Sequence, residues 1–362
     1  MRQGLDEVDW AGLTHAYGPA DDVPALIRAL LSPDADVRGE VRHELYSCIA
    51  HQGTRYPATA PAVPFLLELA ADSATPDRGQ LVDFLEFVAT GDGQPTWRRY
   101  PIGELRAAGP SSALAAYDAV AEGVPLFAAL VGDADAEIAV PAAQALAVFP
   151  EHAGRSSAAL ADAADDDEAP VALATMALLG LGAVAPAGTG AYDEILRRRM
   201  RDDDGGVRWA AALAAARLRR PGLLPEALAE LRRWAAALVH GKGGGAPWYG
   251  IREDLALEEL AEIDPDGHDE RVRPILDRLL GETPSSNWHN HLLIILEQAG
   301  LLSGAAPDRG PVPLEALDVT QRRLVEQLCE RPDIFAGDDA LMPLGWAGLP
   351  DTLAALRQYA GR

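Results

Sequence analysis

The chain of 362 residues has few of the residue types that form metal or redox sites. It contains two cysteines, a single lysine (Lys242) and only 6% aromatic residues. Cys48 and Cys329 lie far apart in the sequence and form no metal-ligand spacing, which excludes a cysteine-based zinc motif. We interpret both as reduced thiols that fill the core of a cytoplasmic protein, and we predict no metal and no cofactor.

Long hydrophobic runs are also missing. The first ten residues, MRQGLDEVDW, contain no apolar run, so we expect no signal peptide. The longest uncharged apolar stretch, Val171 to Pro186, is shorter than the roughly 20 residues that span a bilayer, which predicts a buried helix. The formal net charge of −24 makes nucleic acid and anionic membranes unfavourable partners and favours a partner with a basic patch.

The clearest pattern is a helix, a turn and a second helix between Asp22 and Thr54. Apolar residues at helical spacing mark both helices, and Asp34 in the turn is the expected N-cap of the second. The first helix carries Val23, Leu26, Ile27, Leu30 and Leu31, and the second carries Val37, Val41, Leu45, Cys48 and Ile49. Two such helices cannot bury both stripes alone, so the unit requires stacked neighbours.

Related turns recur along the chain. Acidic turns like the one before Val37 precede Ile138, Val171 and Val207, with intervals of 101, 33 and 36 residues. The longest interval leaves room for one further unit and an insertion. A period in the thirties with two helices per unit is typical of an α-solenoid.

The spacing and the Asp-x-x-Val-Arg type of turn resemble HEAT repeats, in particular the short alanine-rich bacterial form. The turn arginine is present at Arg38 and Arg208, whereas the other two units have Ala139 and Ala172. The resemblance implies an all-α fold, a right-handed α-solenoid of about seven or eight stacked helical hairpins with atypical caps. It also implies that second helices line a concave face.

We therefore expect one solenoid over residues 1–362. Its predicted parts are an N-terminal cap (1–21), two repeats (22–90), an insertion forming a loop over one face (91–122), regular repeats (123–221), divergent repeats (222–310) and a C-terminal cap (311–362). Long or final helices are expected at Leu223 to Leu238, Leu314 to Cys329 and Thr352 to Tyr359.

The polar segment from His51 to Tyr56 has no close counterpart in the later units and is our first candidate for a site. One interpretation is a helix end closed by Gly53, with His51 bonded to the terminal carbonyls. The other is a binding segment. The full set of candidate binding residues is His51, Gln52, Thr54, Tyr56, Trp97, Arg99, Tyr100, Arg208, Trp209, Trp248, Tyr249, Trp288, His289 and His291.

The remaining candidates are weaker. His289 and His291 are two residues apart, which places them on different faces of a helix and disfavours a shared metal. Arg208 and Trp209 lie in a segment, Tyr192 to Ala235, with ten arginines and seven acidic residues, where an anion pocket is one interpretation and a solvated surface the other. Lys242 lies in the glycine-rich run 241–245, which we interpret as a loop, with a lid as the functional alternative.

Three functional hypotheses follow. The first is a non-catalytic scaffold that recognises a protein or peptide, with a basic patch on that partner, in the concave groove. The second is a groove enzyme acting on a small molecule, with His51, His289 or His291 as general acid or base. The third is a structural spacer within a larger complex. No catalytic triad is legible, and we favour the first.

Overall fold

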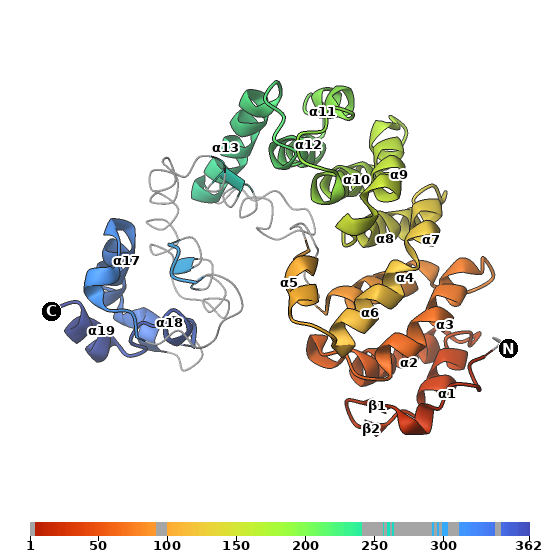
Figure 1. Cartoon of the computed structure of the whole chain (residues 1–362). Coiled ribbons are helices and arrows are strands. Elements are labelled where there is room, and N and C mark those ends of the chain that lie inside the picture. The colour runs from red at the N-terminus through yellow and green to blue at the C-terminus, as the bar shows by residue number, and fades with distance from the viewer. Residues whose placement is uncertain are drawn as a thin grey trace. The chain divides into compact units, whose positions relative to one another are not determined.

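The computed structural model describes residues 4–91, 100–240, 256, 259–260, 263, 292, 295–296, 299–302, 311–336 and 342–362. Within these ranges the protein is helical, apart from a two-stranded antiparallel ribbon near the N-terminus (Figure 1). Two compact units divide the chain, unit 1 from Met1 to Glu230 and unit 2 from Leu231 to Arg362.

Unit 1 begins with the strands β1 (Thr14–His15) and β2 (Gly18–Pro19). Its helices are α1 (Val23–Ala29), α2 (Ala35–Ile49), α3 (Thr59–Ala71), α4 (Arg78–Thr90), α5 (Ile102–Ala107), α6 (Ser112–Ala121), α7 (Val124–Leu130), α8 (Ala136–Leu146), α9 (Ala153–Asp165), α10 (Val171–Val184), α11 (Asp193–Arg199) and α12 (Gly205–Arg217). Short 3₁₀ turns lie at Trp10–Gly12, His51–Gly53 and Pro150–His152. Helix α13 (Leu224–His240) begins in unit 1.

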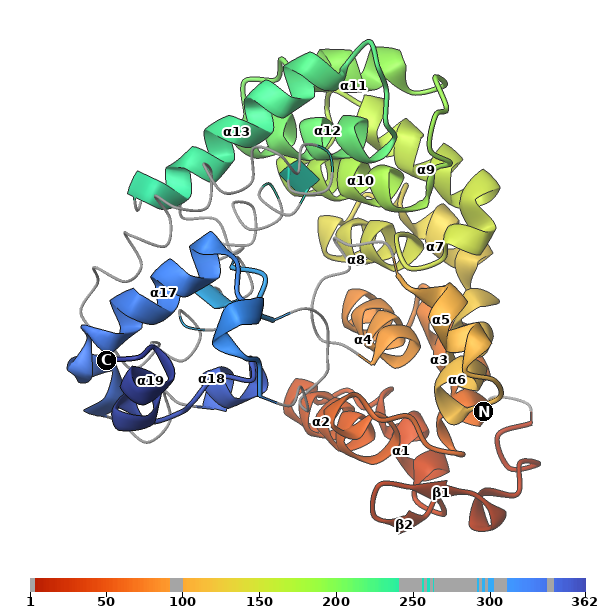
Figure 2. The same cartoon turned by 60° about the vertical axis from the view of Figure 1, so that its left-hand side comes forward.

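The helices of unit 1 pack in pairs. Consecutive helices contact each other in α1–α2, α3–α4, α7–α8, α9–α10 and α11–α12, and the second helices α4, α8, α10 and α12 contact one another in succession. Figure 2 shows these second helices in one row and their first helices in another. This pairing is the one that the apolar periodicity predicts, and it buries both stripes of each hairpin.

The acidic turns act as helix caps. The side chains of Asp34, Asp135 and Asp204 accept hydrogen bonds from first-turn N–H groups of α2, α8 and α12. Each bond satisfies a backbone donor that has no partner within the helix. The predicted capping role of Asp34 is confirmed, and the recurrence of aspartate in these turns has the same cause.

The insertion expected to form a loop instead contributes helices to unit 1. Residues 92–99 lie outside the described ranges, but α5 and α6 follow them, and α6 packs against α3 and α4. Ser111 caps α6, and Tyr117 and Val120 are fully buried on its inner face. An apolar stripe on a capped helix explains why this segment joins the core.

Unit 2 is described mainly near its C-terminus. Its elements are the 3₁₀ turns Leu314–Ala316 and Pro332–Ala336 and the helices α17 (Val319–Cys329), α18 (Met342–Trp346) and α19 (Leu353–Tyr359). Asp318 and Gln321 form a capping box at α17, and Arg357 of α19 donates to the carbonyl of Cys329. The helix predicted over Leu314 to Cys329 is thus interrupted at the Asp318 cap.

In the described ranges, no single helix is long and apolar enough to cross a bilayer. Only α6 and α7 taken together reach that length and composition, and the pair is bent by 49°.

Candidate functional site

The segment His51–Tyr56 connects α2 to α3 at one end of unit 1. Helix α2 ends at Ile49, and a 3₁₀ turn over His51–Gly53 follows in which Gln52 has a φ of 48° and Gly53 a φ of 80°. Among the described residues, the His51 ring makes no hydrogen bond to the last carbonyls of α2, and its Nδ1 lies 3.2 Å from the hydroxyl of Tyr17. The interpretation of His51 as a carbonyl cap is therefore wrong, whereas Gly53 does adopt a left-handed conformation.

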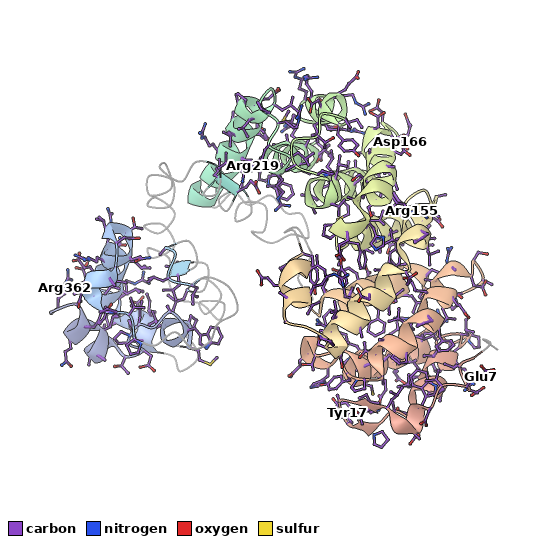
Figure 3. All side chains as sticks on the ribbon, in the orientation of Figure 1. Glu7, Tyr17, Arg155, Asp166, Arg219 and Arg362 are labelled. Carbon is purple, nitrogen blue, oxygen red and sulfur yellow. The ribbon has the colours of Figure 1, made fainter. Side chains whose placement is uncertain are left out.

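The N-terminal ribbon holds this segment from the other side. Tyr17 is 66% exposed and lies at the margin of unit 1 (Figure 3). Its ring meets the His51 ring edge-on at 5.5 Å between centroids. The amide of Ala58 donates to the carbonyl of Thr14, and the amide of Ala16 to that of Cys48. These bonds fix the ribbon against the ends of α2 and α3.

Gly53 and Gly91 form a close backbone contact under the segment. A Cβ atom on Gly53 would lie 2.0 Å from the carbonyl oxygen of Gly91, the residue that ends α4. Arg55 lies in the same contact, and its Nη1 donates to the carbonyl of Gly53. Only residues without a Cβ fit here, which explains why the segment departs from the later units.

The other described candidates near this segment have local partners. The amide of Tyr56 donates to the hydroxyl of Thr59, and Gln52 and Thr54 are exposed. The Tyr100 ring stacks on buried Tyr117 at 5.4 Å, and its hydroxyl lies 3.4 Å from the carbonyl of Ala89. Tyr100 therefore belongs to the packing of α6, while His51, Gln52 and Thr54 remain available at the surface.

A cluster that the sequence did not predict lies under the ribbon. His15, Asp22 and Cys48 each place a ligand-type atom within 4.8 Å of the others. The Nδ1 of His15 accepts the amide hydrogen of Tyr17 at 3.0 Å, and its Nε2 lies 3.0 Å from Oδ1 of Asp22. Because Nδ1 is an acceptor, Nε2 carries the proton and donates to Asp22.

This tautomer does not fit a metal. Coordination through Nε2 would require the proton on Nδ1, where the Tyr17 amide already donates. Burial, with Asp22 and Glu44 nearby, raises the pKa of the Cys48 thiol to about 11, which disfavours the thiolate that a metal needs. The cluster is therefore a structural hydrogen-bonded contact. Its members are 7 and 26 residues apart along the chain, without a ligand motif, so no sequence signal marks it.

A groove of about 690 Å³ runs between α4 and α8. It is lined by Ser73, Thr75, Asp77, Arg78, Gly79, Gln80, Asp83, Asp135, Ala136, Glu137, Ile138, Val140, Pro141, Gln144 and Ala172. The N-termini of the two helices meet closely, since a Cβ on Gly79 would lie 1.8 Å from the carbonyl oxygen of Glu137. The groove is thus formed by second helices of consecutive pairs.

Two carboxylates that line this groove have no cation partner among the described residues. Asp83 and Glu137 are exposed and make no ion pair or side-chain hydrogen bond with any described residue. Surrounding protein and the charge of Glu137 raise the pKa of Asp83 to about 6. Asp77 and Asp133 differ, because Arg38 and Arg42 bind Asp77, and Arg78 lies 3.5 Å from Asp133. Asp83 and Glu137 are the residues of the groove that sequence reasoning missed.

Aromatic rings lie one turn further along α4. Phe87, four residues after Asp83, packs against Tyr46 of α2 with 4.6 Å between ring centroids. Tyr46 is 38% exposed and Phe87 is buried, so one ring of the pair reaches the surface. The spacing of four residues places Phe87 on the same face of α4 as Asp83.

The anion pocket that was one interpretation of Arg208 and Trp209 is not formed by these two residues. Trp209 is 2% exposed and packs in the core of α12. Arg208 donates through Nη1 to the carbonyls of Asp202 and Asp203, and its Nε lies 3.8 Å from Glu230. This arginine therefore closes its own turn and pairs with α13, as Arg38 closes the first turn through the carbonyl of Ser32.

The other candidates fall outside the described residues. They are Trp97, Arg99, Trp248, Tyr249, Trp288, His289, His291 and the glycine-rich run around Lys242.

No known protein family matches the chain, and no curated protein matches it. Among solved structures, the crystal structure of an engineered protein from the Northeast Structural Genomics Consortium has 16% sequence identity and a TM-score of 0.33, covering 94% of this chain and 97% of its own. A TM-score this low supports no assignment.

Proposed function

We propose that the protein is a HEAT-like, right-handed α-solenoid that works as a non-catalytic recognition scaffold. The succession of helix pairs in unit 1 supports the solenoid, because each pair buries its stripes against the next. The ligand is a basic segment of a protein or peptide, and it binds in the groove between α4 and α8.

The unpaired Asp83 and Glu137 carboxylates carry this proposal. Burial and the like charge of Glu137 raise the pKa of Asp83, which is an unfavourable arrangement for the isolated protein, and an arginine or lysine from outside would relieve it. An arginine fits best, because its planar guanidinium can bond two carboxylates at once. The exposed Tyr46 ring, which packs on Phe87 of α4, is of the residue type that anchors interfaces.

A binding titration with matched variants tests the proposal. The probe is a fluorescent peptide of alternating arginine and alanine, with a glutamate-for-arginine peptide as its negative control. We expect the double variant Asp83→Asn/Glu137→Gln to bind the basic peptide at least about tenfold more weakly than the wild type.

The control variant is Asp21→Asn/Glu40→Gln, which removes the same two charges from exposed residues without described partners. Equal weakening in the two double variants would mean that the peptide senses only net charge, and the groove proposal would then fail. The wild-type affinity should also fall with salt, since the contact is ionic.

The enzymatic alternative has two contacts in its favour. His15 lies within hydrogen-bond reach of Asp22, and His51 within reach of Tyr17, as general acid–base chemistry requires. However, no histidine lines the α4–α8 groove, nor the smaller groove of about 500 Å³ beside α7, α9 and α10. The scaffold proposal is therefore the better supported.

A further inference from the structure

Arg55 differs from most arginines of unit 1, because it has no carboxylate partner among the described residues although its Nε is buried. In the described part of this unit, ten arginines lie within 4.0 Å of a carboxylate, among them Arg38 with Asp77 and Arg106 with Glu151. Arg55 has no such partner among the described residues, and its one hydrogen bond goes to the carbonyl of Gly53. An unpaired guanidinium is unexpected in a chain with 55 acidic and 31 basic residues.

The guanidinium of Arg55 is also partly removed from water. Its Nε is buried and has no hydrogen-bond partner, while the residue as a whole is partly exposed. Burial lowers the pKa of Arg55, and the only opposing charge effect comes from Tyr100. A buried charge without a counterion is costly, so the position favours the arrival of an anion.

One edge of the guanidinium has no hydrogen-bond partner among the described residues, and its shape matches an oxyanion. Nη1 is engaged by Gly53, which leaves the Nε and Nη2 edge, the fork that binds two oxygens of a carboxylate or phosphate. Gly53 and Gly91 keep the backbone close on the Nη1 side, because a Cβ on Gly91 would overlap Nη1. The guanidinium is therefore fixed in place before any ligand binds.

We propose that Arg55 is the centre of an oxyanion-binding site that takes a carboxylate or phosphate group at its Nε and Nη2 edge. The exposed side chains of Gln52 and Thr54, on either side of Gly53, supply uncharged hydrogen-bonding groups at its rim. This site is independent of the α4–α8 groove and of the basic partner proposed there.

Titration of the full chain with inorganic phosphate and with acetate, each against sodium chloride of equal ionic strength, tests the proposal. The readouts are the melting temperature and the Nε–H signals of the arginines in proton–nitrogen NMR spectra. We expect a saturable rise in melting temperature and a saturable shift of one Nε–H signal, which is absent from Arg55→Lys. The tighter of the two probes identifies the source as a phosphate or a carboxylate ligand.

Three variants make the result specific. Arg55→Lys keeps the charge but loses the fork, so its affinity should fall about tenfold. Arg55→Gln should lose saturable binding, while Arg155→Gln, which changes an exposed arginine on α9 that makes no described pair, should bind as the wild type does (Figure 3). Circular dichroism spectra that match the wild type would show that the variants are folded.

The opposite results overturn the proposal. One such result is a wild-type protein whose melting temperature and NMR signals respond to phosphate and acetate only as they do to chloride. The other is an equal loss of anion affinity in Arg155→Gln and Arg55→Gln. Asp92 follows Gly91 in the sequence. Binding that emerged only in Asp92→Asn would show that the chain fills this position with its own carboxylate, which also overturns it.

Discussion

Arg38 of α2 donates from its Nε to Oδ2 of Asp77 at a distance of 2.8 Å, which joins the first helix pair to the second. Asp77 immediately precedes α4 and has a φ of 53°, so its side chain turns toward α2 instead of capping its own helix. Arg42 donates to the same oxygen at 2.9 Å. The hydrogen bond from Arg38, with that from Arg42, holds the pKa of Asp77 below its ordinary value.

Replacing Asp77 tests this link. We expect Asp77→Asn to lower the free energy of unfolding by about 1–3 kcal/mol at pH 7, because it leaves two guanidinium groups without the negative charge that they share. A lowered pKa stabilises the fold above the unfolded-state pKa of about 3.9, and this stabilisation is lost as the pH falls. The urea unfolding curves of Asp77→Asn and the wild type should therefore differ at pH 7 and approach each other as the pH falls below about 4. Asp21→Asn, which removes an unpaired exposed carboxylate, should not separate from the wild type by more than a few tenths of a kcal/mol.

Asp83 has the opposite dependence on pH. Its pKa is about 6 in the folded protein, so the fold binds more protons than the unfolded chain between about pH 4 and pH 6. The stabilisation is fully present below about pH 4 and is lost as the pH rises through 6. Since Asp83 is exposed to solvent, we expect a loss of only about 1 kcal/mol. Urea unfolding at pH 4.5 and pH 7.5 should show that Asp83→Asn removes this dependence of the free energy of unfolding on pH, and an unchanged dependence would contradict the raised pKa of Asp83.

Gly79 and Gly39 make a matched pair of glycine-to-alanine changes. Gly79→Ala would drive a Cβ into the backbone carbonyl of Glu137, so α4 and α8 must separate at a cost of about 1–3 kcal/mol. Gly39 lies within α2, where the nearest atom to a new Cβ is the end of the Arg42 side chain at 4.0 Å. Gly39→Ala should therefore stabilise the protein by about 0.5–1 kcal/mol through helix propensity. In thermal or urea unfolding, the midpoint of Gly79→Ala should fall below that of the wild type, and the midpoint of Gly39→Ala should rise above it.

The two cysteines report on the packing of both units. Cys48 and Cys329 are buried, and burial raises the pKa of both thiols, that of Cys48 to about 11. At pH 8 the thiolate fraction of Cys48 is then on the order of 100-fold below that of a free cysteine. We expect a thiol reagent to label both residues rapidly in urea and very slowly in the native protein. A new exposed cysteine in Ala108→Cys should label quickly in both conditions, and fast native labelling of Cys48 would contradict the buried α2–ribbon contact.

The regular helix pairs could be predicted from sequence because their causes are local. Apolar residues at helical spacing, the Asp34 cap and a proline in the first turn of α1 are all adjacent to the structure they specify. The same local signals mark α13 and α19. Helix α6 was missed because the segment before it is rich in glycine and proline, which masked the apolar face of Tyr117 and Val120.

The site residues could not be predicted in the same way. The contact of Tyr17 with His51 spans 34 residues, and the charge effect of Glu137 on Asp83 spans 54. Neither contact leaves a pattern in the sequence, because two distant helices or turns must first be packed together. The unusual feature of Arg55 is the absence of an acidic partner among the described residues, and a chain this acidic gives no hint of that.

The arginines that pair with aspartates across consecutive helices also affect how the protein attracts a charged partner. Arg38 with Asp77, Arg78 with Asp133 and Arg198 with Asp165 direct positive charge into the joints between hairpins. The carboxylates in excess then dominate the electric potential that an approaching molecule encounters. A cationic partner would be drawn in over roughly one Debye length, about 8 Å at physiological salt, so its association rate should rise steeply on dilution of the buffer. The dissociation rate, set by short-range contacts, should change far less.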